Sequence, residues 1–384
     1  MTDWGDVLVI GAGPTGLCCA YYLEQAGIRY TVVDRSDKIG STWANLYPSL
    51  HLNTANFVSN LPGQRIPLKY GVYPSGRNFY QYLQDYAKQH QFHIRLNVTV
   101  KRVSPLGTHW RVETSEGTHV FKNVMIATGR FGNPYIPTFE GQSRFQGKII
   151  HSNQYREADT FKNQKILIIG NGPTGVDIAL ELTQTAILPV YLAVRSDLVI
   201  ARSYPWGLPN SAWQYIAQTF LPQKWRKAFL DRVVYHSYRD AHEIGVRLAP
   251  NRVDRIGSST PIRGRGLIDA IKKQVIYPVA GVRRFHENTV ELQDGSHLPA
   301  DTVILATGYR PVLSYLDIPY ETDIDGWPLR ISSEIEGGKT QVKDHAGLYL
   351  VGRFYRGLGP LYNIRHEAET AVNEIQQRLQ EFST

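Results

Sequence analysis

Two glycine-rich segments of this chain have the spacing that binds the pyrophosphate of a dinucleotide. Each follows an apolar run that predicts a buried parallel strand (6–10 and 165–169) and precedes a helix-forming run. In such a turn the first glycine makes the tight bend, the second lets the backbone approach the pyrophosphate, and the third lets helix and strand pack closely. One copy is a weak signal, but two copies spelled G-x-G-P-T-G indicate two bound dinucleotides and hydride transfer between them. The residues concerned are Gly11, Gly13, Pro14, Thr15, Gly16, Gly170, Asn171, Gly172, Pro173, Thr174 and Gly175.

The residue after the second strand of each half predicts which dinucleotide binds there. The first half reaches Asp34, followed by Arg35. A carboxylate accepts hydrogen bonds from ribose hydroxyls and repels a 2′-phosphate, which suits FAD or NAD. The second half reaches Arg195 and Ser196, whose guanidinium and hydroxyl suit the 2′-phosphate of NADP. A turn or helix-cap role for Asp34 and a solvated surface position for Arg195 are the alternatives. We expect FAD at the first site and NADPH at the second.

The two halves repeat each other, which predicts an α/β fold with two Rossmann-type dinucleotide-binding domains. Two more matching segments, 123–129 and 301–308, are expected to be buried strands that end in Ala-Thr-Gly and close the two sheets. We expect the NADP domain to be inserted into the FAD domain, with the FAD-binding domain at 1–152 and 310–384 and the NADP-binding domain at 153–309. Insertion is tolerated where the chain leaves and re-enters a domain at neighbouring surface points.

The stretch 202–265 departs from this repeat and has helical apolar spacing. Trp206, Trp213 and Trp225 alternate there with lysines and arginines. The simplest interpretation is a helical insertion whose aromatic side chains pack on the NADP domain. A wall of the substrate passage, an oligomer interface such as that of a homodimer, and a surface for nucleic acid or an anionic membrane are the alternatives.

Composition and charge exclude several other classes of protein. The length of 384 residues allows two domains, and 42% hydrophobic with 20% charged residues is typical of a globular protein. We find no uncharged apolar run of 18 residues, so no membrane span is expected, and the early first strand leaves no room for a signal peptide. The net charge of +8 comes from scattered residues, which does not favour nucleic acid. The only cysteines, Cys18 and Cys19, form no CxxC pair and fit a cytoplasmic location.

A motif between the two halves gives the chain a family resemblance. The segment 145–155 matches FxGxxxHxxxY, the identifying pattern of flavin-containing monooxygenases, or class B flavoprotein monooxygenases. The segment 40–43 is similar to the family's GGTW, and 306–309 matches its Ala-Thr-Gly-Tyr motif. The stretch 261–311 resembles the plant YUCCA-type branch. The resemblance implies further cofactor contacts, with Trp43 covering part of the flavin and His151 serving the linker. These contacts are expected at Thr42, Trp43, His51, Asn53, Val100, Ala127, Thr128, Gly129, Thr307, Gly308 and Tyr309.

Two departures from the relatives concern the substrate pocket. Baeyer–Villiger relatives usually carry Trp in place of Tyr155 and an arginine-containing stretch where this chain has residues 47–54. Asn53 and Thr54 instead resemble the element with which N- and S-oxygenating members place an amide beside flavin and substrate, and YUCCA enzymes lack that asparagine. Asn53 is therefore the candidate catalytic residue, with a turn-forming asparagine as the alternative.

The resemblance implies a reaction of NADPH, FAD and dioxygen with a small-molecule substrate and no metal. In the family, NADPH reduces the flavin and oxygen adds to give a C(4a)-hydroperoxyflavin. The protonated form suits a nucleophilic nitrogen or sulfur, which is the favoured substrate class. The peroxide form would attack a carbonyl, as in Baeyer–Villiger oxidation or YUCCA-like oxidative decarboxylation of a 2-oxo acid. A flavoprotein that acts as an NADPH oxidase or reductase without oxygenation is the third hypothesis.

Overall fold

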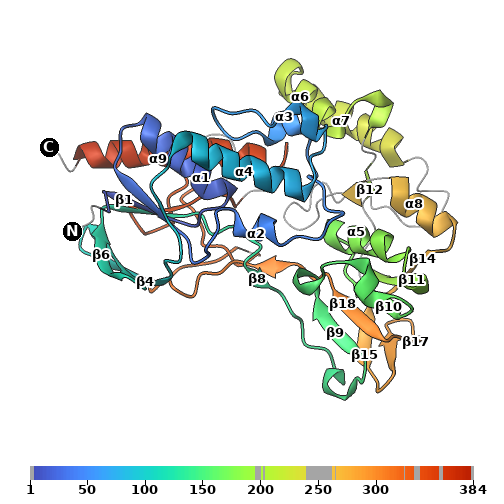
Figure 1. Cartoon of the computed structure of the whole chain (residues 1–384). Coiled ribbons are helices and arrows are strands. Elements are labelled where there is room, and N and C mark those ends of the chain that lie inside the picture. Colours follow the sequence, from blue (N-terminus) through green and yellow to red (C-terminus); the bar gives the residue numbers. More distant parts are fainter. Residues whose placement is uncertain are drawn as a thin grey trace. The chain divides into compact units, whose positions relative to one another are not determined.

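The chain divides into two compact units, and each is continuous in space but not in sequence. Unit 1 comprises Met1–Asn45, Thr54–Asn133 and Tyr309–Thr384, whereas unit 2 comprises Leu46–Asn53 and Pro134–Gly308. Figure 1 shows the computed structural model of the chain. The structure describes residues 4–194, 200–201, 204–238, 262–263, 265–323, 325–332, 338–353 and 358–381.

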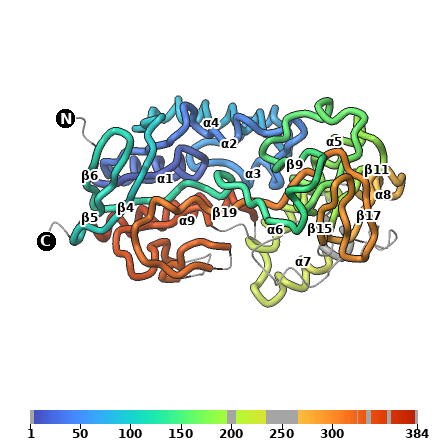
Figure 2. Tube along the Cα trace, turned by 90° about the horizontal axis from the view of Figure 1, so that it is seen from below, coloured from blue at the N-terminus to red at the C-terminus, as the bar shows by residue number. Residues whose placement is uncertain are grey.

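Unit 1 is built on a five-stranded parallel sheet in the order β20-β7-β1-β2-β3. All residues of its four longer strands are buried, as expected for parallel strands that are covered on both faces. Helices α1 and α9 lie side by side in Figures 1 and 2. The elements are β1 (Val7–Ile10), α1 (Pro14–Gln25), β2 (Tyr30–Val33), α2 (Ser41–Ala44), α3 (Asn56–Ser59), α4 (Gly76–His90), β3 (Ile94–Arg95), β7 (Asn123–Ile126), β20 (Leu348–Leu350) and α9 (Pro360–Glu381).

An antiparallel sheet covers one face of these parallel strands. It consists of β4 (Val100–Leu106), β5 (His109–Thr114) and β6 (Gly117–Phe121). Trp110 and Phe121 of this sheet lie in one buried cluster with Leu8 and Ile10 of β1. Because alternate residues of a strand point to opposite faces, this cluster fixes which face of β1 meets the antiparallel sheet.

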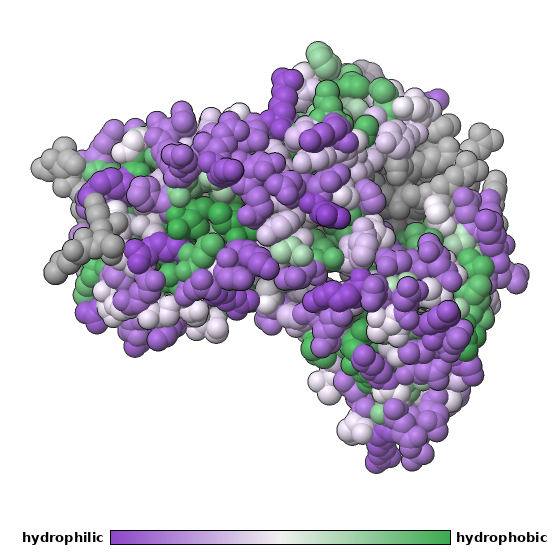
Figure 3. Space-filling model, in the orientation of Figure 1, coloured by the Kyte–Doolittle hydropathy of each residue, from purple (hydrophilic) through white to green (hydrophobic). Residues whose placement is uncertain are grey.

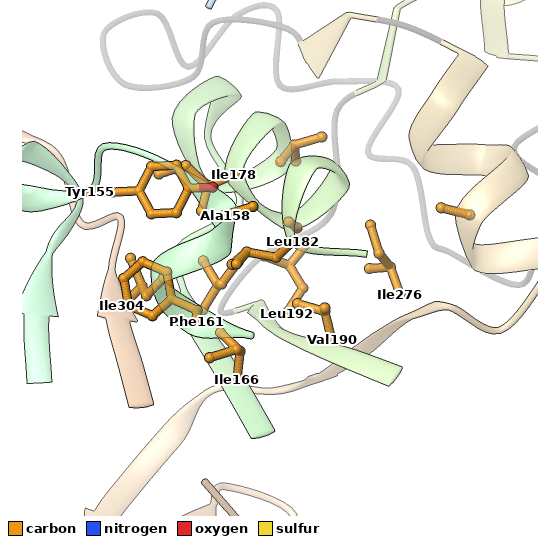
Figure 4. Close-up of a cluster of buried hydrophobic side chains, with 14 of the residues drawn as sticks. Tyr155, Ala158, Phe161, Ile166, Ile178, Leu182, Val190, Leu192, Ile276 and Ile304 are labelled. Atoms are coloured by element: carbon orange, nitrogen blue, oxygen red, sulfur yellow. The ribbon is translucent and has the colours of Figure 1, made fainter. Parts of the chain in front are cut away.

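Unit 2 repeats the same plan on a second parallel sheet, in the order β14-β11-β10-β18-β9. Ile166 and Ile168 of β10 pack with helix α5 in the buried cluster of Figure 4, whereas Leu167 and Ile169 pack toward an antiparallel sheet of β15, β16 and β17. The elements are β9 (Lys148–His151), β10 (Lys165–Ile169), α5 (Pro173–Leu182), β11 (Ile187–Val194), α8 (Arg265–Lys272), β14 (Ile276–Ala280), β15 (Val282–Phe285), β16 (Thr289–Leu292), β17 (His297–Pro299) and β18 (Thr302–Leu305).

The unit boundaries differ from the expected ones at two places. Strand β9 pairs in parallel with β18, so the chain passes into unit 2 after Asn133 and not after residue 152. The segment Leu46–Asn53, expected within the FAD domain, belongs to unit 2. The chain passes between the units near the short strands β8 (Asn133–Pro134) and β19 (Tyr309–Arg310).

The Trp-rich insertion of unit 2 forms a helical hairpin. It contains α6 (Asn210–Phe220) and α7 (Gln223–Tyr238), next to the short paired strands β12 (Ile200–Ala201) and β13 (Ile262–Arg263). Trp213 packs edge-on to Trp206 and contacts Phe229, whereas Trp225 and Phe220 are exposed. Figure 3 shows hydrophobic surface over these helices. In the part of the chain that the structure describes, no helix is long and apolar enough to cross a membrane.

Candidate dinucleotide and substrate sites

The first fingerprint has the steric signature of a dinucleotide turn. Gly11 has φ of +112°, and a Cβ on it would lie 2.6 Å from the carbonyl oxygen of Ala127. A Cβ on Gly16 would lie 1.8 Å from the oxygen of Gly11, so only glycine lets α1 approach the strand this closely. A Cβ on Gly13 would meet no atom within 4 Å. The open space above Gly13 is where a ligand could approach the backbone.

The second fingerprint reproduces this geometry in unit 2. Gly170 has φ of +117°, and its Cβ would lie 2.4 Å from the oxygen of Ala306. A Cβ on Gly175 would lie 2.1 Å from the oxygen of Gly170, and one on Gly172 would meet no atom within 4 Å. In both copies the alanine of the Ala-Thr-Gly motif touches the first glycine. That contact explains why the two motifs occur together in each half.

The helices that follow the fingerprints present their N-termini to an anion. Both α1 and α5 begin with proline after a glycine N-cap in extended conformation, and neither cap supplies a side-chain acceptor. Neither first turn contains an acidic residue that would neutralise the positive end of the helix dipole. Thr15 and Thr174 lie in these first turns. Each N-terminus therefore fits the pyrophosphate of a dinucleotide.

Asp34 is held in a fixed orientation at the end of β2. Its Oδ2 accepts a hydrogen bond from the backbone N–H of Ala12 at 2.8 Å, and its Oδ1 accepts one from Ser36 N–H at 2.8 Å. The first bond joins the carboxylate to the fingerprint loop itself. Because a carboxylate can accept about four hydrogen bonds, capacity is left for ribose hydroxyls. The side chain of the neighbouring Arg35 is exposed.

The other residues expected at the flavin lie at several places in unit 1. Thr42 and Trp43 are on the short helix α2. Trp43 is half-buried and packs edge-on to Phe79, with the two ring centroids 4.5 Å apart. Val100 begins β4 and packs on the unit 1 core. Ala127, Thr128 and Gly129 directly follow β7, and Tyr309 lies edge-on to Phe131 at 5.3 Å.

In unit 2 the structure gathers the expected linker residues around the end of β18. The Thr307 hydroxyl donates to the carbonyl oxygen of Tyr135, and His151 Nε2 lies 3.1 Å from the oxygen of Gly308. His151 Nδ1 accepts from the N–H of Asn153, which places the ring proton on Nε2. Burial lowers the pKa of His151, so the ring is neutral. His151 thus fixes the point where the chain leaves unit 2.

The substrate-pocket candidate lies on the segment Leu46–Asn53. Asn53 is exposed, as is His51, whose Nδ1 lies 2.9 Å from the oxygen of Ser49. Unit 2 therefore carries Asn53, and unit 1 begins again at Thr54, whose hydroxyl is 2.7 Å from that of Ser59. Arg195 and Ser196, which are expected to bind the 2′-phosphate, lie outside the described residues.

Sequence patterns did not reveal a buried ionic cluster after β20. A Cβ on Gly352 would lie 2.7 Å from Thr15 Oγ1, which places this turn against the fingerprint helix. Arg353 pairs with Asp323 at 2.7 Å, and burial lowers the pKa of its guanidinium. Glu367 of α9 accepts hydrogen bonds from Gly352 N–H at 2.6 Å and from the guanidinium of Arg330 at 2.8 Å. No local motif marks these residues, because their partners are distant in sequence.

One cluster in unit 2 has the residue types of a metal site but not the charge. His286, Glu291 and His297 bring possible ligand atoms within 4.8 Å of one another. Glu291, however, is paired with Arg283 at 2.9 Å and with Arg284 at 3.0 Å. His286 and these arginines lower the pKa of Glu291. Two guanidiniums on one carboxylate leave a positive environment that disfavours a cation.

Each of the two parallel sheets is thus followed by a glycine turn and a helix N-terminus with the geometry of a dinucleotide site. A family profile described as pyridine nucleotide-disulphide oxidoreductase matches residues 8–203. The chain is 30% identical over 362 residues to the probable indole-3-pyruvate monooxygenase YUCCA1 of Arabidopsis thaliana, covering 91% of this chain and 85% of that protein. It is 28% identical over 374 residues to an uncharacterized CzcO-like oxidoreductase of Geobacillus kaustophilus, and the alignment covers 96% of this chain and 98% of that protein.

Solved structures share the fold over the whole chain. A flavin-containing monooxygenase from Stenotrophomonas maltophilia aligns with a TM-score of 0.75 at 23% identity and covers all of both chains. An open structure of cyclohexanone monooxygenase aligns with a TM-score of 0.71 at 18% identity, covering 99% of this chain and 88% of that one.

The chain belongs to the class B flavoprotein monooxygenases, a branch of the pyridine nucleotide-disulphide oxidoreductases. The expected family, the α/β Rossmann fold class and the flavin-dependent monooxygenase activity are confirmed, as are FAD and NADPH as the cofactors of the family. The disulphide chemistry in the name of the wider family has no counterpart here. Cys18 and Cys19 are buried free thiols on α1, and burial raises the pKa of both.

Proposed function

We propose that unit 1 holds FAD and unit 2 holds NADPH, and that the enzyme transfers one oxygen atom from dioxygen to a small nucleophilic substrate. The paired fingerprints carry the assignment of two sites, because each leaves space only above its second glycine. Asp34, fixed by Ala12 and Ser36, would accept hydrogen bonds from the FAD ribose. Arg195 and Ser196, next to the end of β11, would bind the 2′-phosphate of NADPH.

When both cofactors are bound, FAD reduced by NADPH supplies activated oxygen, and the chain supplies binding, orientation and a dry site. The N-termini of α1 and α5 would stabilise the two pyrophosphates. Trp43, half-buried against Phe79, would cover one side of the flavin. His151 is neutral and its two ring nitrogens are both engaged, so it orients the chain at Gly308 and does not act as a base.

Asn53 carries the proposal that the substrate contains nitrogen or sulfur. Its exposed amide can donate one hydrogen bond and accept another, which no apolar residue of similar volume can do. An amide donor would favour the neutral, protonated form of the activated oxygen, which is the electrophile that a soft nitrogen or sulfur nucleophile attacks. The segment that carries Asn53 belongs to unit 2, together with the second fingerprint.

A YUCCA-like oxidative decarboxylation of a 2-oxo acid is the second candidate. The observation that favours it is the 30% identity to YUCCA1, a probable indole-3-pyruvate monooxygenase, over most of both chains. A carboxylate substrate needs a cationic partner in a dry site. Among the described residues, half-buried Arg365 on α9 is a candidate, with its guanidinium 4.9 Å from the ring centroid of Tyr362.

A substrate screen with one variant tests the proposal. Amines, sulfides and 2-oxo acids are assayed for oxygenated product per NADPH consumed, with the wild type and Asn53→Leu. We expect an N- or S-oxide from the wild type. In the variant, product yield should fall at least about tenfold, since a lost donor in a dry site costs on the order of 2–4 kcal/mol. NADPH should then yield hydrogen peroxide, while flavin content and anaerobic flavin reduction stay unchanged.

Two results would contradict this assignment. If Asn53→Leu still forms one oxygenated product per NADPH consumed, Asn53 is a turn residue, and the support for N- or S-oxygenation is lost. Turnover of 2-oxo acids alone, with release of carbon dioxide, would establish the second candidate.

A further inference from the structure

The segment Leu46–Asn53, here called the strap, is a short piece of chain that leaves unit 1 and returns to it. Its flanking residues Asn45 and Thr54 belong to unit 1, whereas the strap itself belongs to unit 2. A segment of this length without helix or strand stays on another unit only if specific contacts hold it. Those contacts identify the residues of unit 2 that hold the strap.

Two carboxylates of α5 hold the strap by its hydroxyl groups. The Tyr47 hydroxyl donates to Asp177 Oδ2 at 3.1 Å, and the Ser49 hydroxyl donates to Glu181 Oε2. Asp177 and Glu181 are four residues apart, so they lie on the same face of the helix, one turn from each other. Hydrogen bonds to ionised acceptors are about twice as strong as neutral ones.

Packing beneath the strap reinforces these bonds. Tyr47 is 5% exposed, and its ring centroid lies 6.2 Å from that of Tyr155, the last residue of the family motif. Tyr155 stacks on Phe161 at 5.5 Å, and Figure 4 shows it beside Ile178 of α5. Burial and the nearby Glu181 carboxylate raise the pKa of Tyr155, so its hydroxyl stays neutral.

The helix that holds the strap is the helix that begins at the second fingerprint. Asp177 lies four residues after Pro173, and Glu181 eight residues after it, which places them about 6 and 12 Å along the helix axis from its start. One rigid helix therefore connects the pyrophosphate-binding turn at Gly172 with the anchors of the strap. The helix that begins at that turn therefore also holds Tyr47 and Ser49, which precede Asn53 in the strap.

We propose that Asp177 and Glu181 are positioning residues that hold Asn53 in register with the nucleotide of unit 2. The proposal rests on the proposed function of Asn53. Removing an anchor should loosen the strap without changing either fingerprint. NADPH would still reduce the flavin, but the amide would no longer be in place when oxygen is transferred.

Four variants and a control measure this role. Glu181→Leu removes the acceptor, Ser49→Ala removes the donor of the same bond, Asp177→Leu removes the other anchor, and Glu181→Gln keeps an acceptor oxygen. Thr183→Ala is the matched control, because its hydroxyl bonds only locally, to the oxygen of Leu180 at the end of the same helix.

Hydrogen exchange of the strap amides gives a readout that is independent of turnover. Losing a bond to a charged acceptor should speed exchange within residues 46–53 about tenfold or more in Glu181→Leu, Ser49→Ala and Asp177→Leu, but not in Glu181→Gln or the control. Product per NADPH should fall toward the level of Asn53→Leu in the same three variants. If Glu181→Leu fails to fold, Ser49→Ala still tests the same hydrogen bond from its donor side.

A double-mutant cycle shows whether the anchor acts through Asn53. In the Asn53→Leu background, Glu181→Leu should cause no further loss of coupling. An additive loss, or unchanged exchange and coupling in Ser49→Ala, would overturn the positioning role. If Asn53→Leu alone stays coupled, the proposed function fails, whereas the exchange data still decide whether α5 holds the strap.

Discussion

The second glycine of each fingerprint offers a substitution that separates cofactor binding from folding. Gly172 has φ of −75° and ψ of 174°, which any L-residue adopts, and an added Cβ would meet no protein atom within 4 Å. Gly172→Ala should therefore fold. The methyl group would occupy the space through which a pyrophosphate approaches the backbone. Gly13, with φ of −85° and ψ of −172°, is the matching position of unit 1.

The expected magnitudes follow from this geometry. Removing glycine's freedom in the unfolded chain stabilises by about 0.4–1 kcal/mol. The poorer N-cap costs a similar amount, so the melting temperature should change by no more than about 2–4 °C. Losing one hydrogen bond to a phosphate costs about 1.5–3 kcal/mol, which weakens NADPH binding roughly 10- to 150-fold. Gly175→Ala should instead disrupt unit 2, because its Cβ would lie 2.1 Å from the oxygen of Gly170.

Calorimetric titration with NADPH, flavin absorbance and thermal unfolding test these expectations together. Gly172→Ala should keep full flavin content and lose nucleotide affinity, whereas Gly13→Ala should lose flavin and keep its fold. A correctly folded Gly172→Ala that binds NADPH as tightly as the wild type would refute the assignment of unit 2.

Three further expectations follow from single residues. Arg195→Ala should remove most of a roughly 10- to 150-fold preference for NADPH over NADH in nucleotide titrations without loss of flavin, and a wild type that binds both equally would refute the role of Arg195. Burial lowers the pKa of His151, so below about pH 6.5 the unfolded chain binds a proton that the folded chain does not, and stability falls with falling pH. His151→Gln should flatten that fall in thermal unfolding, and an unchanged slope would contradict it. Cys18 and Cys19 should react with a thiol reagent only after denaturation, because burial raises their pKa; reaction in the native protein would contradict their burial.

Local sequence patterns predicted the parts of the fold that depend on local contacts. The fingerprints specify strand, turn and helix within about 20 residues. The contact of Gly11 with Ala127 joins the glycine fingerprint to the Ala-Thr-Gly motif, and both motifs can be recognised in the sequence. Compact unit 2 begins before the boundary expected at residue 152, and strand β9 resembles a linker until its distant partner β18 is known.

The strap was not predictable because its contacts are long-range. Tyr47 and Asp177 are 130 residues apart, and no sequence pattern around either residue predicts that they form a hydrogen bond. The pair of Arg330 with Glu367 is hidden for the same reason. Sequence reasoning found Asn53 through its family resemblance, but it could not show that unit 2 carries the residue.

Oxygen-isotope labelling tests the central claim that this chain is a monooxygenase using FAD and NADPH. The holoenzyme is supplied with NADPH, ¹⁸O₂ and each amine, sulfide or 2-oxo acid in turn, and label in the product is measured by mass spectrometry. The account predicts one labelled oxygen atom in the product for each NADPH consumed with a good substrate. NADPH consumption matched by hydrogen peroxide, with unlabelled products throughout, would contradict it.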